Sequence, residues 1–371
     1  MKYALLPLPL LILAACPGEK STDDEGIERI DLGTFTTDTG FGADVPVDVP
    51  EGAVSSIVAC GPYGTDTLAT AETITAPDAS VVYDMNDPEA TAFRIGVQDD
   101  FLPMLLPVSP DLDLTTGAYT YRVYVDTTEA ATISCQALFR TEPPSGDPTV
   151  NLHLIFVGVE AATGLNATSA HDDAALTAAL DEVTSLWAGA GITVGTISYE
   201  DFGGDVDTYS SVDGDAEYSQ LLKTANTDDA RLIPIFFVNA ITDSDGATIL
   251  GQAAGPPGAA GMGGNAKSGA VVTVIPLVDG DTALMGRLLA HELFHFMGLF
   301  HPTSKDGAET DPLSDTPTCP LSADADANGT LSTDECAGTG AENLMWWAAS
   351  DTSTDVSGDQ GWVVTRSPVA L

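Results

Sequence analysis

The second half of the chain alternates apolar runs with amphipathic segments, which is the pattern of strands followed by helices. A strand is expected at 149–159, a helix at 172–191 that Gly191 closes, a strand at 192–201, a helix near 216–225 and a strand at 231–241. A glycine-rich loop at 251–269 and an apolar strand at 270–277 then lead into a helix that contains "HELFHFMGLFH". This order predicts a mixed, twisted α/β (α+β) sheet in a domain spanning residues 147–371.

Residues 51–146 show a different pattern, with short alternating runs such as "GAYTYRVYVD" and "ATISCQALFR" between turn residues. Alternation with period two predicts strands with one buried face, so we expect a small all-β sandwich domain. The segment "EPPSGDP" ends it. It carries no cluster of catalytic residues, and a spacer or a binding module is favoured over a pro-domain.

The N-terminus reads "MKYALLPLPLLILAAC", with one basic residue, an apolar run and then Leu13-Ala14-Ala15-Cys16. This is a secretory signal of residues 1–16, and L-A-A-C resembles the bacterial lipobox, in which Cys16 is lipidated. The resemblance implies a lipid-anchored protein of the bacterial cell envelope; an ordinary cleaved signal peptide is the alternative. Residues 17–50 are acidic and rich in Gly, Thr and Pro, so a disordered tether is expected there.

Composition adds a strong negative charge, because 55 acidic residues against 12 basic ones give a net charge of −43. Such a surface repels phosphates, so nucleic acid is excluded as a partner. Five cysteines would leave one thiol unpaired in an exported protein, unless Cys16 carries the lipid. The simplest pairing of the other four is Cys60 with Cys135 and Cys319 with Cys336.

The stretch from His291 to His301 holds three of the chain's five histidines. His291 and His295 lie one turn apart on one face of a helix, and Gly298 permits the reversal that brings His301 back to them. Three imidazoles suit Zn²⁺ with a position open for water, and Glu292 can act as the base for that water. A core helix with satisfied histidines is the alternative, and the register of Gly298 and His301 speaks against it.

The pattern H-E-x-x-H-x-x-G-x-x-H is the metzincin signature, and "ENLMWW" supplies Met345 for the Met-turn that packs beneath a metzincin zinc site. The segments "DPLSDTPTC" and "DQGWVVTRSP" resemble the pappalysin branch (cytophagalysin, ulilysin-like). The resemblance covers roughly residues 149–371 and implies a zinc endopeptidase acting on protein or peptide substrates. Pro302 differs from the pappalysin pattern and resembles the serralysin branch instead. Trp347 stands where several metzincins carry a tyrosine that assists the transition state.

The segment "DADANGTLSTDE" fits the loop pattern of EF-hand calcium sites. Its expected ligands are oxygens from Asp324, Asp326, Asn328, the Thr330 carbonyl and Glu335, with Gly329 making the turn. An acidic surface loop is the alternative. The pappalysin resemblance implies calcium near this region.

The sequence therefore predicts a lipid-anchored zinc endopeptidase of the metzincin clan, with Ca²⁺ as a second metal. One alternative is a surface adhesion or binding lipoprotein with a degenerate, non-proteolytic metzincin domain. Another is a calcium-dependent binding module dominated by residues 51–146. His153 alternates within a strand and His171 opens a helix, so both are expected to be structural or solvated.

Overall fold

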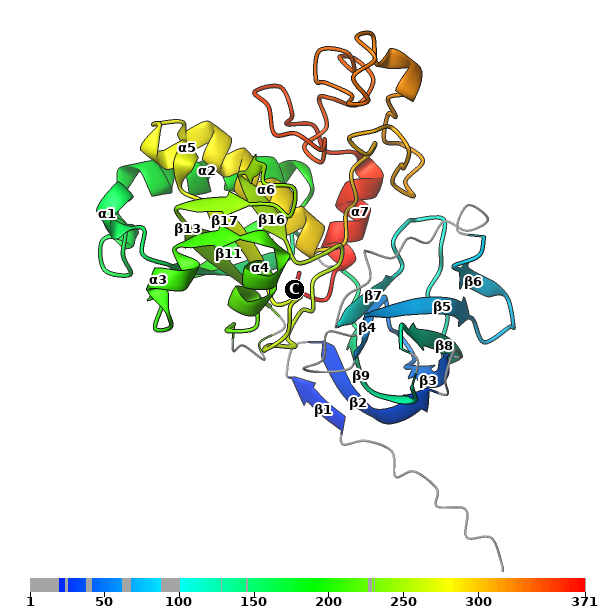
Figure 1. The fold of residues 1–371 in the computed structure, drawn as a ribbon. Coiled ribbons are helices and arrows are strands. Elements are labelled where there is room, and N and C mark those ends of the chain that lie inside the picture. Colours follow the sequence, from blue (N-terminus) through cyan, green and yellow to red (C-terminus); the bar gives the residue numbers. More distant parts are fainter. Residues whose placement is uncertain are drawn as a thin grey trace, which may run out of the picture.

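The computed structural model describes residues 20–23, 26–37, 42–61, 68–87, 101–127, 129–144, 146–225, 229 and 231–370. It has an all-β part formed by the first third of the chain and an α/β part formed by the rest (Figure 1). Within the described residues, no helix is both long and apolar enough to cross a membrane. The predicted signal peptide, including Cys16, lies outside the described residues.

The all-β part consists of two antiparallel sheets in the strand orders β1-β2-β9-β4-β7 and β3-β8-β5-β6. Their buried sides share one hydrophobic core. The strands are β1 (Lys20–Asp23), β2 (Ile27–Thr37), β3 (Ala43–Val49), β4 (Ser55–Gly61), β5 (Ala69–Thr75), β6 (Val81–Asp84), β7 (Leu102–Leu106), β8 (Gly117–Val125) and β9 (Ala131–Arg140). The two runs singled out in the sequence are β8 and β9.

The prediction of a disordered tether at residues 17–50 is wrong for most of that segment, because β2 pairs with β9 and β3 pairs with β8. The sandwich therefore begins well before residue 51. Strand β3 alternates buried and exposed residues along its whole length. Its acidic residues and its proline all face outward, so a polar composition there is compatible with a folded strand. The proline is tolerated because β3 is an edge strand.

The α/β part is built on a five-stranded sheet in the order β11-β10-β13-β17-β16. The first four strands are parallel and the edge strand β16 is antiparallel, so the sheet is mixed as expected. Its strands are β10 (Thr149–Phe156), β11 (Thr193–Asp201), β13 (Leu232–Val238), β16 (Gly251–Ala253) and β17 (Ala270–Thr273). A small sheet beside it contains β12 (Ser211–Asp213), β14 (Ala240–Thr242) and β15 (Thr248–Ile249).

Helices cover both faces of this sheet, with α2 and α6 on one face and α4 on the other (Figure 1). Asp173 caps α2 by accepting a hydrogen bond from the Leu176 N–H, and Trp187 near its end stacks on Phe294 of α6. The helices are α1 (Glu160–Thr163), α2 (Ala174–Gly189), α3 (Val206–Tyr209), α4 (Gly214–Leu222), α5 (Ile275–Val278), α6 (Thr282–Phe296) and α7 (Gly358–Arg366). Short 3-10 turns lie at Ala170–Asp172 and Leu321–Ala323.

The expected strand at 270–277 ends early, because α5 begins at Ile275. Pro276 lies in the first turn of α5, where a helix needs no backbone N–H. Helix α6 follows and is buried from Met285 to Phe296. A helix buried on all sides holds its polar residues in fixed positions, and these include three of the predicted site residues.

The segment between α6 and α7 has little regular structure. A small separate core fixes part of it, formed by Leu331, Ala341, Trp346 and the disulfide between Cys319 and Cys336. Helix α7 closes the domain and covers most of the segment "DQGWVVTRSP". It starts with a capping box in which Ser357 and Gln360 bond to each other's backbone N–H.

Candidate metal centre and cleft

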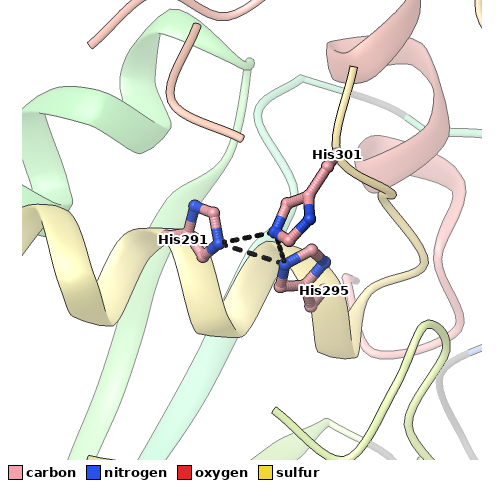
Figure 2. Close-up of side chains that lie close together, drawn as sticks. All are labelled: His291, His295 and His301. Atoms are coloured by element: carbon pink, nitrogen blue, oxygen red, sulfur yellow. Dashed lines mark hydrogen bonds between the residues drawn. The ribbon is translucent and has the colours of Figure 1, made fainter. Parts of the chain in front are cut away.

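The structure brings His291, His295 and His301 together, as their spacing predicted. His291 and His295 project from α6, and Gly298 adopts a left-handed φ of 110° that turns the chain back toward His301. The Nε2 atom of His295 lies 3.0 Å from that of His291 and 2.9 Å from that of His301, and His291 and His301 are 3.3 Å apart. Figure 2 shows the three rings pointing toward one another.

Backbone carbonyls set the tautomers of two of these rings. His291 Nδ1 lies 2.8 Å from the Leu344 oxygen, and His295 Nδ1 lies 2.6 Å from the Leu299 oxygen. A carbonyl oxygen only accepts, so each Nδ1 carries the hydrogen and each Nε2 presents a lone pair. Lone pairs that converge at this distance repel one another unless a cation lies between them.

The triad fits zinc in its donors and dimensions. Tetrahedral zinc with Zn–N bonds of about 2.0–2.1 Å separates its nitrogen ligands by about 3.3 Å. The Nε2 separations of 2.9–3.3 Å are near that value. The carbonyls of Leu344 and Leu299 orient the ligand rings, as outer partners of metal-bound histidines do.

Burial also keeps the imidazoles in the form that binds a metal. It lowers the pKa of His291 to about 4 and that of His301 to about 3. The pKa of His295 is also lowered well below its ordinary value, by burial and by the two neighbouring rings. All three rings are therefore neutral at pH 7, and a cation binds them without displacing protons.

Glu292 follows the first histidine and lines the same cleft. Burial raises its pKa to about 8, and a hydrogen bond from the Ala253 backbone acts in the opposite direction. A cation at the triad would favour the ionised carboxylate. Gly251 allows the close approach of β16, because a Cβ there would lie 2.9 Å from a carboxylate oxygen of Glu292.

The cleft has a volume of about 300 Å³ and contains the three histidines and Glu292. Its other lining residues are Gly251, Gln252, Ala253, Gly255, Pro256, Phe300 and Trp347. The first five of these belong to the glycine-rich loop at 251–269. The sequence analysis did not single out Gln252 and Pro256, because only the tertiary fold brings them to the histidines, and it did not assign Phe300 a role beside His301.

Two glycines explain why that loop can pass beneath the end of α6. The Gly258 N–H donates to the Phe296 carbonyl at 2.9 Å, and a Cβ on Gly258 would lie 2.0 Å from the Phe296 ring. A Cβ on Gly255 would lie 2.8 Å from the His295 carbonyl. The glycines therefore serve close packing against the motif helix.

Met345 is fully buried in the turn that follows Leu344, whose carbonyl orients His291. The turn expected from the sequence therefore lies against the triad. Trp347 lines the cleft, and its indole N–H donates to the Leu331 carbonyl at 2.9 Å.

The acidic loop at 324–335 brings Asp324, Asp326 and Glu335 together, with one carboxylate oxygen from each within 4.8 Å of the others. Asn328 donates to Asp326, and its own side-chain oxygen accepts from the Thr330 N–H. Gly329 has the left-handed φ expected for the sharp turn. Hydrogen bonds from Ser332 and Ala325 lower the pKa of Glu335 to about 2.

Both expected disulfides are present, linking Cys60 to Cys135 and Cys319 to Cys336. Disulfides are typical of proteins outside the cytoplasm. Neither remaining histidine lines the cleft. His153 is held between Ser198 and Glu200, and His171 lies edge-on to Tyr199, which agrees with structural roles.

No protein-family model matches the sequence, and no curated protein matches it. The structure is similar to metalloproteinase-II from Bacteroides fragilis, with a TM-score of 0.33 and 15% identity over 61% of this chain. The chain spans 55% of the length of that protein. It is also similar to infectious bursal disease virus, Gx strain, with a TM-score of 0.21 and 10% identity over 38% of this chain and 39% of that chain. A VP2 subviral particle of that virus is similar with a TM-score of 0.19 and 12% identity over 38% of this chain and 37% of that chain. The site residues, and not these similarities, support the proposal that follows.

Proposed function

We propose that this protein is a zinc-dependent endopeptidase of the metzincin type, with His291, His295 and His301 as the zinc ligands. The observation that carries the proposal is the convergence of three neutral imidazoles whose Nε2 atoms face one point, beside a buried glutamate in an open cleft. When bound, zinc would polarise a peptide carbonyl and lower the pKa of a water molecule toward 7.

Glu292 acts as the general base in this proposal. Its carboxylate accepts a proton from the attacking water and delivers it to the nitrogen of the leaving amine. The Ala253 N–H and the closely packed Gly251 hold the carboxylate in place. Because the Glu292 carboxylate is buried away from water, its affinity for the proton is raised. A raised affinity suits a base that must hold the proton and return it in the second step.

The substrate is an extended peptide. Strand β16 is the edge of the five-stranded sheet and lines the cleft, so its outer side can pair with a further strand. A peptide that adds to this edge would gain backbone hydrogen bonds without regard to sequence, and its scissile bond would pass the triad. Edge pairing of this kind favours unfolded segments and loops of proteins.

Zymography on casein or gelatin tests the proposal, with and without a zinc chelator. Glu292→Gln removes the proton acceptor while keeping a side chain of similar shape, so it should retain zinc but lose nearly all hydrolysis, by about a hundredfold or more. Glu200→Gln, on a different face of the sheet, is the matched control and should keep wild-type turnover. Undiminished turnover of Glu292→Gln would refute the role of Glu292.

Absence of chelator-sensitive hydrolysis in the wild type would favour the alternative of a binding or adhesion protein with a non-proteolytic domain. Trp347 is the feature that favours this alternative, because it replaces a hydroxyl that assists the transition state in several metzincins. Retained zinc in an inactive wild type would establish it.

We further propose that the chain is held at the bacterial envelope by lipid on Cys16 and that the loop at 324–335 binds Ca²⁺. The lipobox resemblance supports the first proposal, and the convergent carboxylates support the second. Cys16→Ser should abolish labelling with radioactive lipid and release the protein from membranes. A variant that still fractionates with membranes would contradict the lipid anchor.

A further inference from the structure

The cleft has one wall that the proposed chemistry does not use. The histidines and Glu292 occupy one side, and Pro256, Phe300 and Trp347 add apolar surface around them. The whole cleft has a volume of about 300 Å³, so beside the reacting groups it has room for about one amino-acid side chain. Its composition decides which side chain fits best.

Trp347 presents hydrocarbon to this space. Its indole Nε1–H, the only polar group of the side chain, is engaged by the Leu331 carbonyl at 2.9 Å. Lys305 Nζ lies 5.5 Å from the ring centre, at a distance that permits a cation–π contact. The Trp347 ring is therefore held in place by residues of the segment between α6 and α7. A substrate in the cleft contacts its apolar surface.

The Leu331 carbonyl is itself fixed. Leu331 is fully buried in the small core with Trp346, beside the disulfide between Cys319 and Cys336. Its backbone N–H donates to the Lys305 carbonyl at 2.8 Å. Because both backbone groups of Leu331 are used in this way, the tryptophan behaves as a rigid wall of the cleft.

We infer that Trp347 determines specificity, so that the enzyme prefers peptides with a large apolar or aromatic side chain next to the scissile bond. The inference rests on the proposed function and names its substrate class. Acidic side chains at that position are disfavoured, since their negative charge would lie beside the carboxylate of Glu292. The segment closed by the Cys319–Cys336 disulfide sets this preference through Leu331, outside the zinc ligands.

The test uses the full zinc-loaded chain and two peptides that differ only at one residue beside the scissile bond, Phe in one and Gly in the other. The wild type should cleave the Phe peptide with a higher kcat/KM, by about tenfold to a hundredfold. Trp347→Ala should remove most of this ratio, because loss of the ring lowers kcat/KM for the Phe peptide more than for the Gly peptide. Trp347→Phe, which keeps an apolar ring but loses the N–H, should keep part of the ratio.

Trp362→Ala is the matched control, because Trp362 lies on α7, stacked on Arg366 and outside the cleft lining. It should leave the ratio unchanged. A second readout avoids turnover: titration calorimetry on Glu292→Gln should show tighter binding of the Phe peptide, and adding Trp347→Ala should remove that difference.

Two failures are distinguishable. If the wild type cleaves neither peptide and binds neither, the proposed function fails and the inference with it. If it cleaves both and Trp347→Ala lowers both rates equally, or leaves the ratio intact, only the role of Trp347 is overturned.

Discussion

The imidazole of His295 is oriented by the Leu299 carbonyl at Nδ1, while its Nε2 faces the Nε2 atoms of His291 and His301. The Leu299 carbonyl comes from the same turn that Gly298 makes possible. The turn that reverses the chain thus also supplies the oxygen that orients the second ligand. Orientation of this kind is what separates a metal site from a chance cluster of histidines.

His295→Ala should therefore lose the metal. Two remaining imidazoles bind zinc far more weakly than three, so we expect well below one zinc per chain by metal analysis, against one in the wild type. Far-ultraviolet circular dichroism should show that the helices remain. His153→Ala, in a strand outside the cleft, is the control and should keep full zinc occupancy. Full zinc occupancy in His295→Ala would contradict the ligand assignment.

The residues of the triad could be predicted because their geometry is local. Helical periodicity and one glycine fix the positions of His291, His295 and His301 relative to one another. Gln252 and Pro256 could not be assigned to the cleft in the same way. They reach it from the glycine-rich loop, and no spacing within the chain encodes that meeting.

Among the elements, strand β3 was predicted to be disordered because of its composition, although its alternation of apolar and polar residues is typical of a strand. Its residues alternate strictly between buried and exposed, and its buried members are Ala43, Val45, Val47 and Val49. The acidic and proline-rich character that indicated disorder belongs to one face only. Periodicity was the better signal there, because a strand can bury one apolar face whatever its average composition.

If the acidic loop at 324–335 binds Ca²⁺ as proposed, it is the element that should depend most on an ion. Carboxylates of Asp324, Asp326 and Glu335 lie within 4.8 Å of one another and repel each other without a cation. Calcium should raise the melting temperature of the wild type and slow its autolysis, because a ligand at a hundredfold excess over its Kd stabilises the folded chain by about 2.7 kcal/mol. Differential scanning calorimetry with and without millimolar calcium measures this gain.

The double variant Asp324→Ala with Glu335→Gln should lose the calcium gain while retaining zinc. Asp334→Asn removes a carboxylate from the same loop that is not expected to coordinate, so it should keep the gain. If calcium shifts the melting of the wild type and the double variant equally, the loop is only a solvated acidic turn.

At the scale of the whole molecule, the sandwich and the α/β part share one continuous core. The contact reaches the metal motif, since a Cβ on Gly298 would lie 2.3 Å from the Leu105 side chain of β7. Arg29 of β2 donates to the Gly261 carbonyl in the glycine-rich loop, and Ser55 of β4 donates to the Arg366 carbonyl at the end of α7. These contacts could not be predicted from the sequence, because each joins residues far apart in the chain.

Arg140 is the polar centre of this junction. It is buried at the end of β9 and donates to the carbonyls of Glu142, Thr365 and Ser367. Burial lowers its pKa to about 10, so it still carries its charge and donates at neutral pH. Arg140→Ala would leave carbonyls after α7 without their donor and open a cavity between the two parts.

We expect Arg140→Ala to lower the free energy of unfolding by about 1–3 kcal/mol, the cost of leaving buried polar groups unsatisfied. The loss should appear in a single urea transition seen equally by fluorescence and circular dichroism, because the shared core makes the two parts unfold together. Arg122→Ala is the matched control. Arg122 pairs with Asp44 and Glu72 on the outer face of the sandwich, so its removal should cost at most about 1 kcal/mol. Separate transitions in the wild type, or equal losses in the two variants, would show that the junction does not couple the two parts.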